Sequence, residues 1–212
     1  GQALAGRAQV QAQKFGATLA VPYSAQQLCC EERPFRLYLE CGNQVRAKSI
    51  VVATGARYRS IDTDNLDKYE GQNVHYAATA IEARLCGSSE VVVIGGGNSA
   101  GQAAVFLSQH ADNVHMLVRG PQLAASMSDY LVGRIHASPK ITLYQNTELC
   151  EIGGDETLRR AAWRHRETGE VTSRDIAHIF VMIGAAPNTD WLDGCLALDD
   201  KGFVLTGKTA EA

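Results

Sequence analysis

Short apolar runs alternate with stretches of helical periodicity through the middle of the chain. Residues 90–94 and 114–118 are apolar and suit buried strands, while residues 98–110 place alanine and leucine at helical spacing. Strands that alternate with helices predict an α/β fold with a parallel sheet. The other elements expected here are helices over residues 77–86 and 125–136, strands over 141–144, 148–152 and 179–183, and a hairpin starting over 158–165.

The first part of the chain has a different pattern. A helix is expected to end near Gly16, and strands are expected over residues 18–21, 35–40 and 45–54. Turn-forming residues 41–44 separate the last two strands, which predicts an antiparallel meander.

This meander is expected to run into a buried strand. Residues 50–56 are apolar and are stopped by Gly55, as buried parallel strands commonly are. Residues 60–73 are polar and acidic, which predicts a surface connection. We therefore place a domain boundary near residue 73.

Charge and hydropathy limit the classes of partner. The 212 residues carry a net charge of -3, so the chain lacks the positive field that nucleic-acid binding normally needs. No apolar run reaches the roughly 18 residues that cross a bilayer. We expect a cytoplasmic protein without a membrane span, and a homodimer is compatible with the sequence.

Cysteines and histidines indicate no metal site. The six cysteines form no C-x-x-C pair, and the six histidines have no ligand spacing. Reduced, mostly buried thiols are expected, with a Cys29–Cys30 disulfide as the alternative. The basic run over residues 159–166 is interpreted as a solvated hairpin face.

A glycine-rich turn follows the apolar run at residues 90–94. Gly95, Gly97 and Ala100 match G-x-G-x-x-A between a strand and a helix. The glycines allow a tight turn and close approach to a pyrophosphate, and the helix start can hold the phosphates. A dinucleotide site is predicted, with a nucleotide-free turn as the alternative. Its residues are Gly95, Gly96, Gly97, Asn98, Ser99 and Ala100.

The residue at the end of the following strand helps to distinguish an NAD site from an NADP site. NAD sites usually place Asp or Glu roughly 20 residues after the glycines, to hold the ribose 2′-hydroxyl. Here Arg119 is present and a carboxylate is absent, which favours the 2′-phosphate of NADP(H). A solvated strand-end charge is the alternative for Arg119. Ile183 and Gly184, which end the last apolar strand, are also assigned to the cofactor.

In order along the chain, five segments resemble motifs of the thioredoxin-reductase type of flavoprotein disulfide reductase, the FAD/NAD(P)H-dependent pyridine nucleotide-disulfide oxidoreductases. These segments are RAQVQAQKFGA, SIVVATGA, VVVIGGGNSAGQAAVFL, VHMLVRG and VMIGAAPNTDWL. The resemblance implies a Rossmann-like NADP-binding domain, residues 74–184, inserted into a partial FAD-binding domain, residues 1–73 and 185–212. It also implies that Thr54 and Gly55 lie near the flavin.

The chain departs from that family at three places. Both cysteines of the family's redox C-A-T-C are alanine here, at Ala77 and Ala80. Gly120 and Ala124 stand where further basic residues are expected to bind the 2′-phosphate. The family's first FAD glycine motif and later G-D motif are not found, so we interpret the chain as an internal piece of a longer protein and expect it to be inactive alone.

The resemblance implies an enzyme, an FAD- and NAD(P)H-dependent oxidoreductase. This chain would be its NADPH-binding portion, passing hydride from NADPH to FAD in the full-length parent without the redox dithiol. No side chain is predicted to be a catalytic acid, base or nucleophile, and the residues do not specify the electron acceptor. The alternative is a non-catalytic NADP-sensing or regulatory module.

Overall fold

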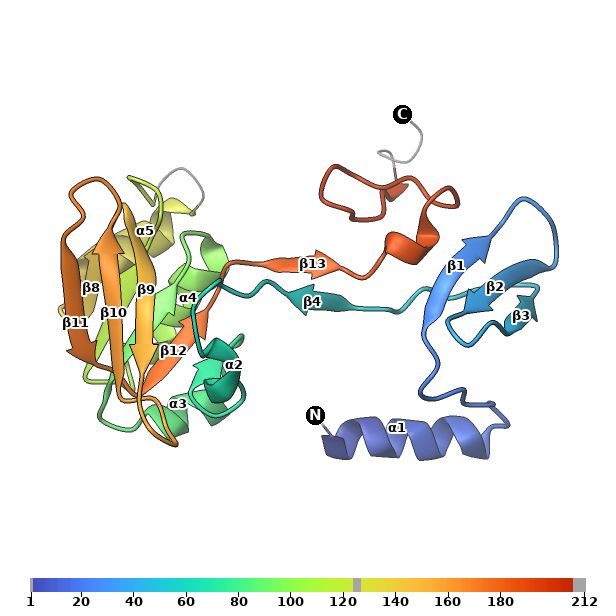
Figure 1. Cartoon of the computed structure of the whole chain (residues 1–212), viewed down its shortest axis with the longest axis horizontal. Helices are drawn as coiled ribbons and strands as arrows, with labels where there is room; N and C mark the ends of the chain where they lie inside the picture. Colours follow the sequence, from blue (N-terminus) through green and yellow to red (C-terminus); the bar gives the residue numbers. More distant parts are fainter. Residues whose placement is uncertain (1, 124–126, 208–212) are drawn as a thin grey trace. The chain divides into compact units, whose positions relative to one another are not determined.

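The computed structural model describes residues 2–123 and 127–207, and the chain divides into two compact units. Unit 1 comprises residues 1–56 and 186–212, and unit 2 comprises residues 57–185. The chain passes between the units through β4 (Ala56–Tyr58) and β13 (Ala185–Pro187), which pair with each other (Figure 1).

A parallel sheet forms the centre of unit 2, in the strand order β5-β12-β6-β7-β8. The central strand β6 has a parallel neighbour on each side, and its Val91, Val92 and Val93 are fully buried. Apolar side chains on both faces suit a strand that is covered on both sides. The strands are β5 (Val74–His75), β6 (Glu90–Ile94), β7 (Asn113–Leu117), β8 (Ile141–Tyr144) and β12 (His178–Val181).

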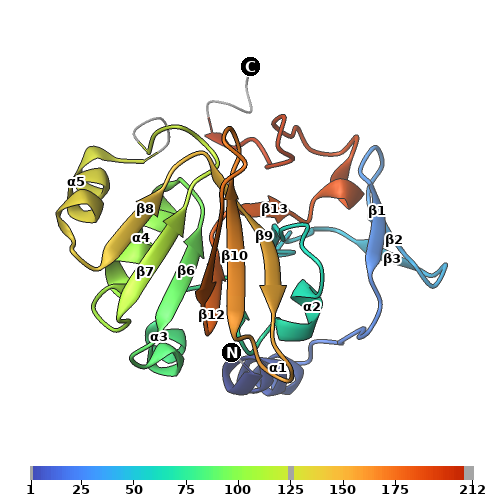
Figure 2. The same cartoon turned by 60° about the vertical axis from the view of Figure 1, so that its left-hand side comes forward.

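Different layers cover the two faces of this sheet (Figure 2). Val91 and Val93 pack with residues of three helices, whereas Val92 and Ile94 pack against an antiparallel sheet of order β11-β10-β9. The predicted α/β architecture of this region is confirmed. The helices are α3 (Ala80–Cys86), α4 (Asn98–Leu107) and α5 (Asp129–Ala137), and the strands are β9 (Thr147–Gly153), β10 (Arg160–His165) and β11 (Val171–Asp175). The expected start of a helix at residue 125 and the Ala124 position lie outside the described residues.

Residues 57–73 belong to unit 2, so the predicted boundary at residue 73 falls inside this unit. The segment was expected to be a surface connection, but it contains the short helix α2 (Leu66–Tyr69). Leu66 and Tyr69 are buried in the core beside the antiparallel sheet, and the Tyr69 hydroxyl donates to the Gly154 carbonyl at 2.7 Å. These two buried side chains hold the segment in place, despite its acidic composition.

Unit 1 contains the predicted helix and the predicted antiparallel meander. Helix α1 (Gln2–Lys14) is followed by Gly16 at φ +86°, and Gly42 forms the turn before β3. The expected strand over residues 18–21 is wrong, because the backbone pairs with β2 only from Ala25 onward. Among the described residues, no helix is long and apolar enough to cross a membrane. The strands are β1 (Ala25–Cys29), β2 (Phe35–Leu39) and β3 (Gln44–Ala47), and the 3-10 helix η1 (Asp190–Leu192) packs near β1.

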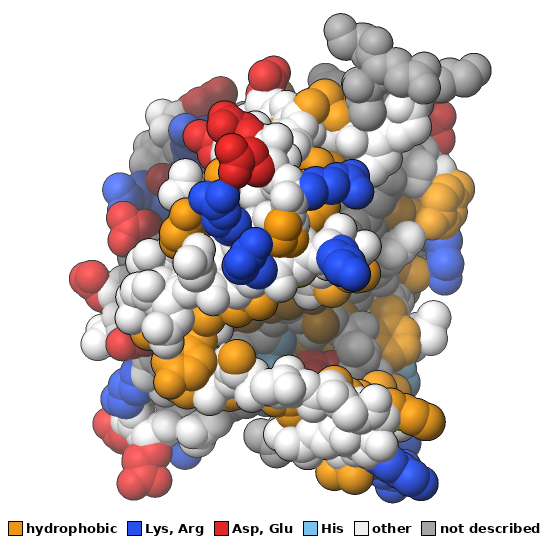
Figure 3. All heavy atoms as spheres, turned by 90° about the vertical axis from the view of Figure 1, so that its right-hand side faces the viewer, with side chains coloured by type: hydrophobic (Ala, Val, Ile, Leu, Met, Phe, Trp, Pro, Cys, Tyr) orange, Lys and Arg blue, Asp and Glu red, His pale blue; other side chains and the backbone are white. Residues whose placement is uncertain are grey.

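The buried strand expected over residues 50–56 is also wrong. Residues 50–55 adopt no strand, and the side chain of Val51 is 90% exposed. An apolar strand of this kind needs parallel neighbours, whereas the sheet within the described part of unit 1 is the antiparallel one formed by β1, β2 and β3. Hydrophobic side chains are visible at several places on the face drawn in Figure 3.

The expectation of reduced, mostly buried cysteines needs correction in unit 1. Cys30 and Cys195 form a disulfide across a sequence separation of 165 residues. This bond joins the two chain segments that make up unit 1. Cys29 is a free thiol, so the alternative Cys29–Cys30 pairing is wrong as well, and Cys41 is exposed.

Candidate functional site

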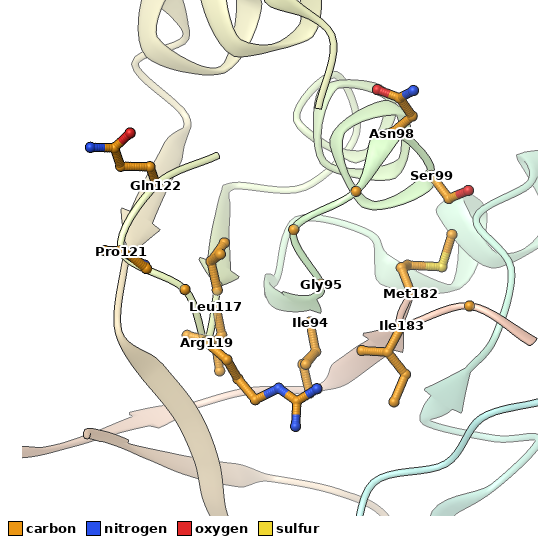
Figure 4. A pocket seen from close by; sticks show the side chains of 15 residues that line it. Ile94, Gly95, Asn98, Ser99, Leu117, Arg119, Pro121, Gln122, Met182 and Ile183 are labelled. Atoms are coloured by element: carbon orange, nitrogen blue, oxygen red, sulfur yellow. The ribbon is translucent and has the colours of Figure 1, made fainter. Parts of the chain in front are cut away.

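A groove of about 600 Å³ lies at the carboxyl ends of β6, β7 and β12 (Figure 4). This is the position at which open parallel sheets bind ligands. The glycine-rich turn forms one wall and the end of β7 forms another. The lining residues are Ile94, Gly95, Gly96, Gly97, Asn98, Ser99, Leu117, Val118, Arg119, Gly120, Pro121, Gln122, Met182, Ile183 and Gly184.

Gly95 is required by close contact between neighbouring strands. Its φ is +144°, and a Cβ atom built there would lie 2.4 Å from the Met182 carbonyl oxygen. Its N–H donates to the Leu117 carbonyl at 3.0 Å. The turn after β6 is therefore fixed against both neighbouring strands, β7 and β12.

Helix α4 presents its N-terminus to the groove. Gly97 occupies the N-cap position without a side-chain cap, and the first-turn residues Asn98 and Ser99 also line the groove. First-turn N–H groups have no partner within a helix and suit phosphate oxygens. The Asn98 side chain accepts from Ser128 N–H at 2.8 Å, which ties this turn to the start of α5.

Ala100 does not line the groove but is fully buried in the first turn of α4. Its Cβ would lie 3.0 Å from a Cβ placed on Gly95. A larger residue at position 100 would press on the turn, so Ala100 serves the packing of helix on strand that the motif predicts.

Arg119 provides positive charge at the β7 end of the groove. Its guanidinium extends toward the side of the groove where Ile94 lies (Figure 4). Among the lining residues that the structure describes, none is an aspartate or glutamate. This end of the groove therefore suits an anionic group better than a ribose hydroxyl.

The remaining predicted residues divide between the two units. Ile183 and Gly184 lie in the groove at the end of β12. Thr54 and Gly55 belong to unit 1, where the Thr54 hydroxyl donates to the Asn188 carbonyl at 2.8 Å. The Asn188 side-chain amide donates back to the Thr54 carbonyl at 3.0 Å, so the ATGA and APNT segments are held together.

A second hollow of about 510 Å³ shares Ser99, Met182 and Gly184 with the groove. It is lined by Tyr76 and Ala77, at the start of the segment where the resemblance places the redox cysteines. The next residues form the start of α3, where Thr79 caps the helix reciprocally with Glu82. The local backbone is thus an ordinary capped helix start.

No nearby thiol replaces the absent pair. Cys86, at the far end of α3, is buried, and burial raises its pKa to about 11. A thiol with this pKa is almost entirely protonated at neutral pH, whereas disulfide exchange needs the thiolate. Within residues 2–123 and 127–207, no group of His, Cys, Asp or Glu side chains could hold a metal ion.

The family model for pyridine nucleotide-disulphide oxidoreductases matches residues 10–211. The chain belongs to this family. Members use FAD together with NAD(P)H, and the resemblance to thioredoxin-reductase-type flavoproteins is confirmed.

The chain is 32% identical over 174 residues to an NADH dehydrogenase of Bacillus subtilis, covering 82% of this chain and 34% of the relative. It is 31% identical over 204 residues to a thioredoxin reductase of Streptomyces coelicolor, covering 96% of this chain and 62% of the relative.

Solved structures confirm the fold. A thioredoxin reductase from Giardia duodenalis superposes with a TM-score of 0.81 at 24% identity, over 97% of this chain and 66% of that one. The thioredoxin reductase from Streptococcus pyogenes gives a TM-score of 0.79 over 98% of this chain and 67% of that one, at 24% identity. The two-dinucleotide-binding-domain type of fold is therefore the correct class, and the chain spans between a third and two thirds of the curated relatives named above.

Sequence reasoning missed part of the groove. Pro121, Gln122 and Met182 line it without belonging to a recognisable motif. A further contact comes from the hairpin, where the Arg166 Nη1 donates to the Arg119 carbonyl at 3.4 Å. The sequence pattern places Arg166 among the solvated hairpin charges, because nothing local indicates that its turn reaches the end of β7.

Proposed function

We propose that unit 2 binds a nicotinamide dinucleotide in the groove and prefers NADP(H) to NAD(H). The observation that carries this proposal is the convergence of three features at one edge of the sheet. They are a turn that only glycine fits at position 95, the uncapped N-terminus of α4, and Arg119 without a competing carboxylate. Each matches a part of the ligand, since backbone N–H groups suit pyrophosphate and arginine suits the 2′-phosphate.

Calorimetric titration of NADP⁺ and NAD⁺ into the chain tests this proposal. Arg119→Gln is expected to weaken NADP⁺ binding by about 10- to 100-fold, the value of a charge-assisted hydrogen bond, and to leave NAD⁺ binding nearly unchanged. Arg134→Gln is a matched control, because Arg134 is an exposed arginine on α5 outside the groove. Equal affinity of the wild-type chain for both dinucleotides would contradict the proposed preference.

We propose that, in the full-length protein, Thr54 and Gly55 contribute to a flavin site. When bound, NADPH and FAD supply hydride transfer, and the protein contributes binding and orientation. The hydrogen bonds between Thr54 and Asn188 support this assignment, because they brace the ATGA segment with the segment that follows β13.

Electron transfer beyond the flavin is proposed to proceed without a thiol pair in this chain. Alanine at positions 77 and 80 cannot exchange with a disulfide, and the protonated Cys86 offers no substitute. Stopped-flow mixing of the FAD-loaded full-length protein with NADPH should bleach the flavin, while a thioredoxin-coupled assay of the same preparation should show no turnover. Robust thioredoxin turnover would contradict this part of the proposal.

The same two alanines favour one alternative, a module that binds NADP(H) as a signal and carries out no redox chemistry. The visible spectrum of the purified full-length protein separates the two functions. Stoichiometric flavin that NADPH bleaches supports the oxidoreductase, and a protein that binds NADPH without flavin supports the sensor.

A further inference from the structure

Three chain segments meet at the β7 end of the groove. The Asn146 N–H donates to the Gly120 carbonyl at 3.0 Å, which joins the turn after β8 to the end of β7. The Arg166 N–H then donates to the Asn146 carbonyl at 2.6 Å, and its guanidinium donates to the Arg119 carbonyl at 3.4 Å. We call residues 118–120, Asn146 and Arg166 the β7 rim.

The β7 rim brings a second guanidinium to the place where Arg119 enters the groove. Arg166 follows the last residue of β10, and its backbone and side chain are both tied to this rim. Its side chain is 53% exposed and can therefore turn toward a ligand. Arg166 lies 47 residues after Arg119 in the sequence. The two residues are neighbours only because the hairpin folds against the end of β7.

A doubly charged phosphate is poorly matched by a single arginine, because a phosphate monoester carries nearly two negative charges at neutral pH. Position 120, next to Arg119, is glycine and adds no charge. A second arginine from another element would restore the charge balance. Arginine is also the side chain best suited to such a contact, since its planar fork matches phosphate oxygens.

We propose that Arg166 is a second binding residue for the 2′-phosphate of NADP(H), acting with Arg119 across the β7 rim. This inference rests on the proposed dinucleotide function and names the residue that completes its specificity. Arg166 thus supplies from the hairpin a second positive charge, in addition to that of Arg119 at the end of β7.

Glu148 competes for the same guanidinium. Its Oε2 lies 3.5 Å from the Arg166 Nε, with side-chain exposures of 45% and 53%. Exposed pairs of this kind are weak, so a phosphate can displace the carboxylate. Removal of the Glu148 charge should therefore strengthen NADP⁺ binding, whereas removal of the Arg166 charge should weaken it.

The same hairpin offers a matched control pair. Arg160 begins β10 and pairs with Glu151 of β9 at 2.6 Å, with side-chain exposures of 57% and 60%. Six residues of extended strand separate it from Arg166, which is about 20 Å. Arg160→Gln and Glu151→Gln thus remove similar charges at a distance from the β7 rim.

The experiment is calorimetric titration of NADP⁺, NAD⁺ and 2′,5′-ADP into the wild-type chain and these variants. Arg166→Gln is expected to weaken binding of NADP⁺ and 2′,5′-ADP by about 10-fold, the lower end for a charged contact, because the side chain is half exposed. NAD⁺ affinity should change by less than about twofold, within the range of a weak exposed ion pair. Glu148→Gln should tighten NADP⁺ binding, and both control variants should behave as wild type.

The outcomes separate this inference from the proposed function. If Arg119→Gln abolishes the NADP⁺ preference but Arg166→Gln behaves as Arg160→Gln, the inference is overturned and the proposed function stands. Equal losses of NADP⁺ and NAD⁺ binding in Arg166→Gln would indicate a structural role and would also overturn the inference. A wild-type chain that binds neither dinucleotide would overturn both.

Discussion

Two apolar segments that end at glycine have similar sequences but different structures. In residues 90–95, EVVVIG, the first five form β6, the central strand of the parallel sheet of unit 2, and Val93 is fully buried between parallel neighbours. Residues 50–55, IVVATG, form no strand, and Val51 is 90% exposed. Local composition is nearly the same in the two segments, so composition does not decide the outcome.

The difference lies in the available partners. Strand β6 pairs with β7 and β12, which are themselves covered by helices on one face and an antiparallel sheet on the other. The 50–55 segment is held by contacts such as the hydrogen bonds between Thr54 and Asn188. An apolar run specifies a buried strand only where neighbouring strands complete its hydrogen bonds.

The largest expected contrast comes from a buried charge. Val93→Asp places a carboxylate at a fully buried position and should destabilise unit 2 by about 3 to 5 kcal/mol. Val51→Asp, at an exposed position, should change stability by less than about 0.5 kcal/mol. Urea unfolding followed by Trp163 in a Trp191→Phe background measures the effect of Val93→Asp on unit 2, and unfolding followed by Trp191 in a Trp163→Phe background measures the effect of Val51→Asp on unit 1. Similar losses in the two variants would show that the 50–55 segment is buried.

The glycines that end the two segments should also differ. Gly95→Ala forces a Cβ to 2.4 Å from the Met182 carbonyl oxygen at φ +144°, and we expect a loss of about 2 to 3 kcal/mol together with weaker dinucleotide binding. Gly55 has φ +63° but open space around it, so Gly55→Ala should cost only about 1 kcal/mol. Thermal unfolding of both variants tests the difference, and equal losses would contradict it.

A smaller contrast between the two units concerns how their stability depends on pH, because all six histidines lie in unit 2. The buried His75 and His178 rings approach at 3.1 Å, and the His178 Nε2 donates to the Leu85 carbonyl at 3.1 Å. His178 therefore accepts at Nδ1 from the His75 N–H, an arrangement that requires the His178 ring to be neutral. Burial lowers the pKa of His178, and burial together with the neighbouring His178 lowers that of His75, although Glu82 opposes the shift for His75.

Because both pKa values lie below the ordinary 6.5, the unfolded chain takes up these protons first as the pH falls. The pair's contribution to stability is thus complete above that value and is lost as the pH drops through the folded pKa values. Urea unfolding between about pH 7.5 and 5.5 should show a loss from unit 2, followed by Trp163, and little change in unit 1, followed by Trp191 in a Trp163→Phe background. A loss confined to unit 1 would contradict this assignment.

Much of unit 2 was predictable because its signals are local. The bounds of β6 and β8 agree with the sequence pattern, and the glycine turn lies between a strand and a helix as expected. Unit 1 was harder, since the fate of residues 50–55 depends on partners that periodicity does not reveal. The Cys30–Cys195 disulfide likewise joins residues that are 165 positions apart.

For the candidate site, the sequence identified groups that a motif carries, namely Gly95 to Ser99 and Arg119. It could not identify Arg166, because the contact with Arg119 depends on how the β10–β11 hairpin turns against the end of β7. Thr54 and Gly55 belong to unit 1, whereas the groove residues belong to unit 2, and only the fold shows this division. Residues that act through long-range packing leave little trace in local patterns.

The central claim, that the turn after β6 binds the dinucleotide, is tested most directly by hydrogen–deuterium exchange of the chain with and without NADP⁺. We predict slower exchange at residues 95–100, 117–122 and 182–184, which line or adjoin the groove, and unchanged exchange at residues 50–55. Protection confined to residues 50–55, or unchanged exchange at residues 95–100 under saturating NADP⁺, would contradict it.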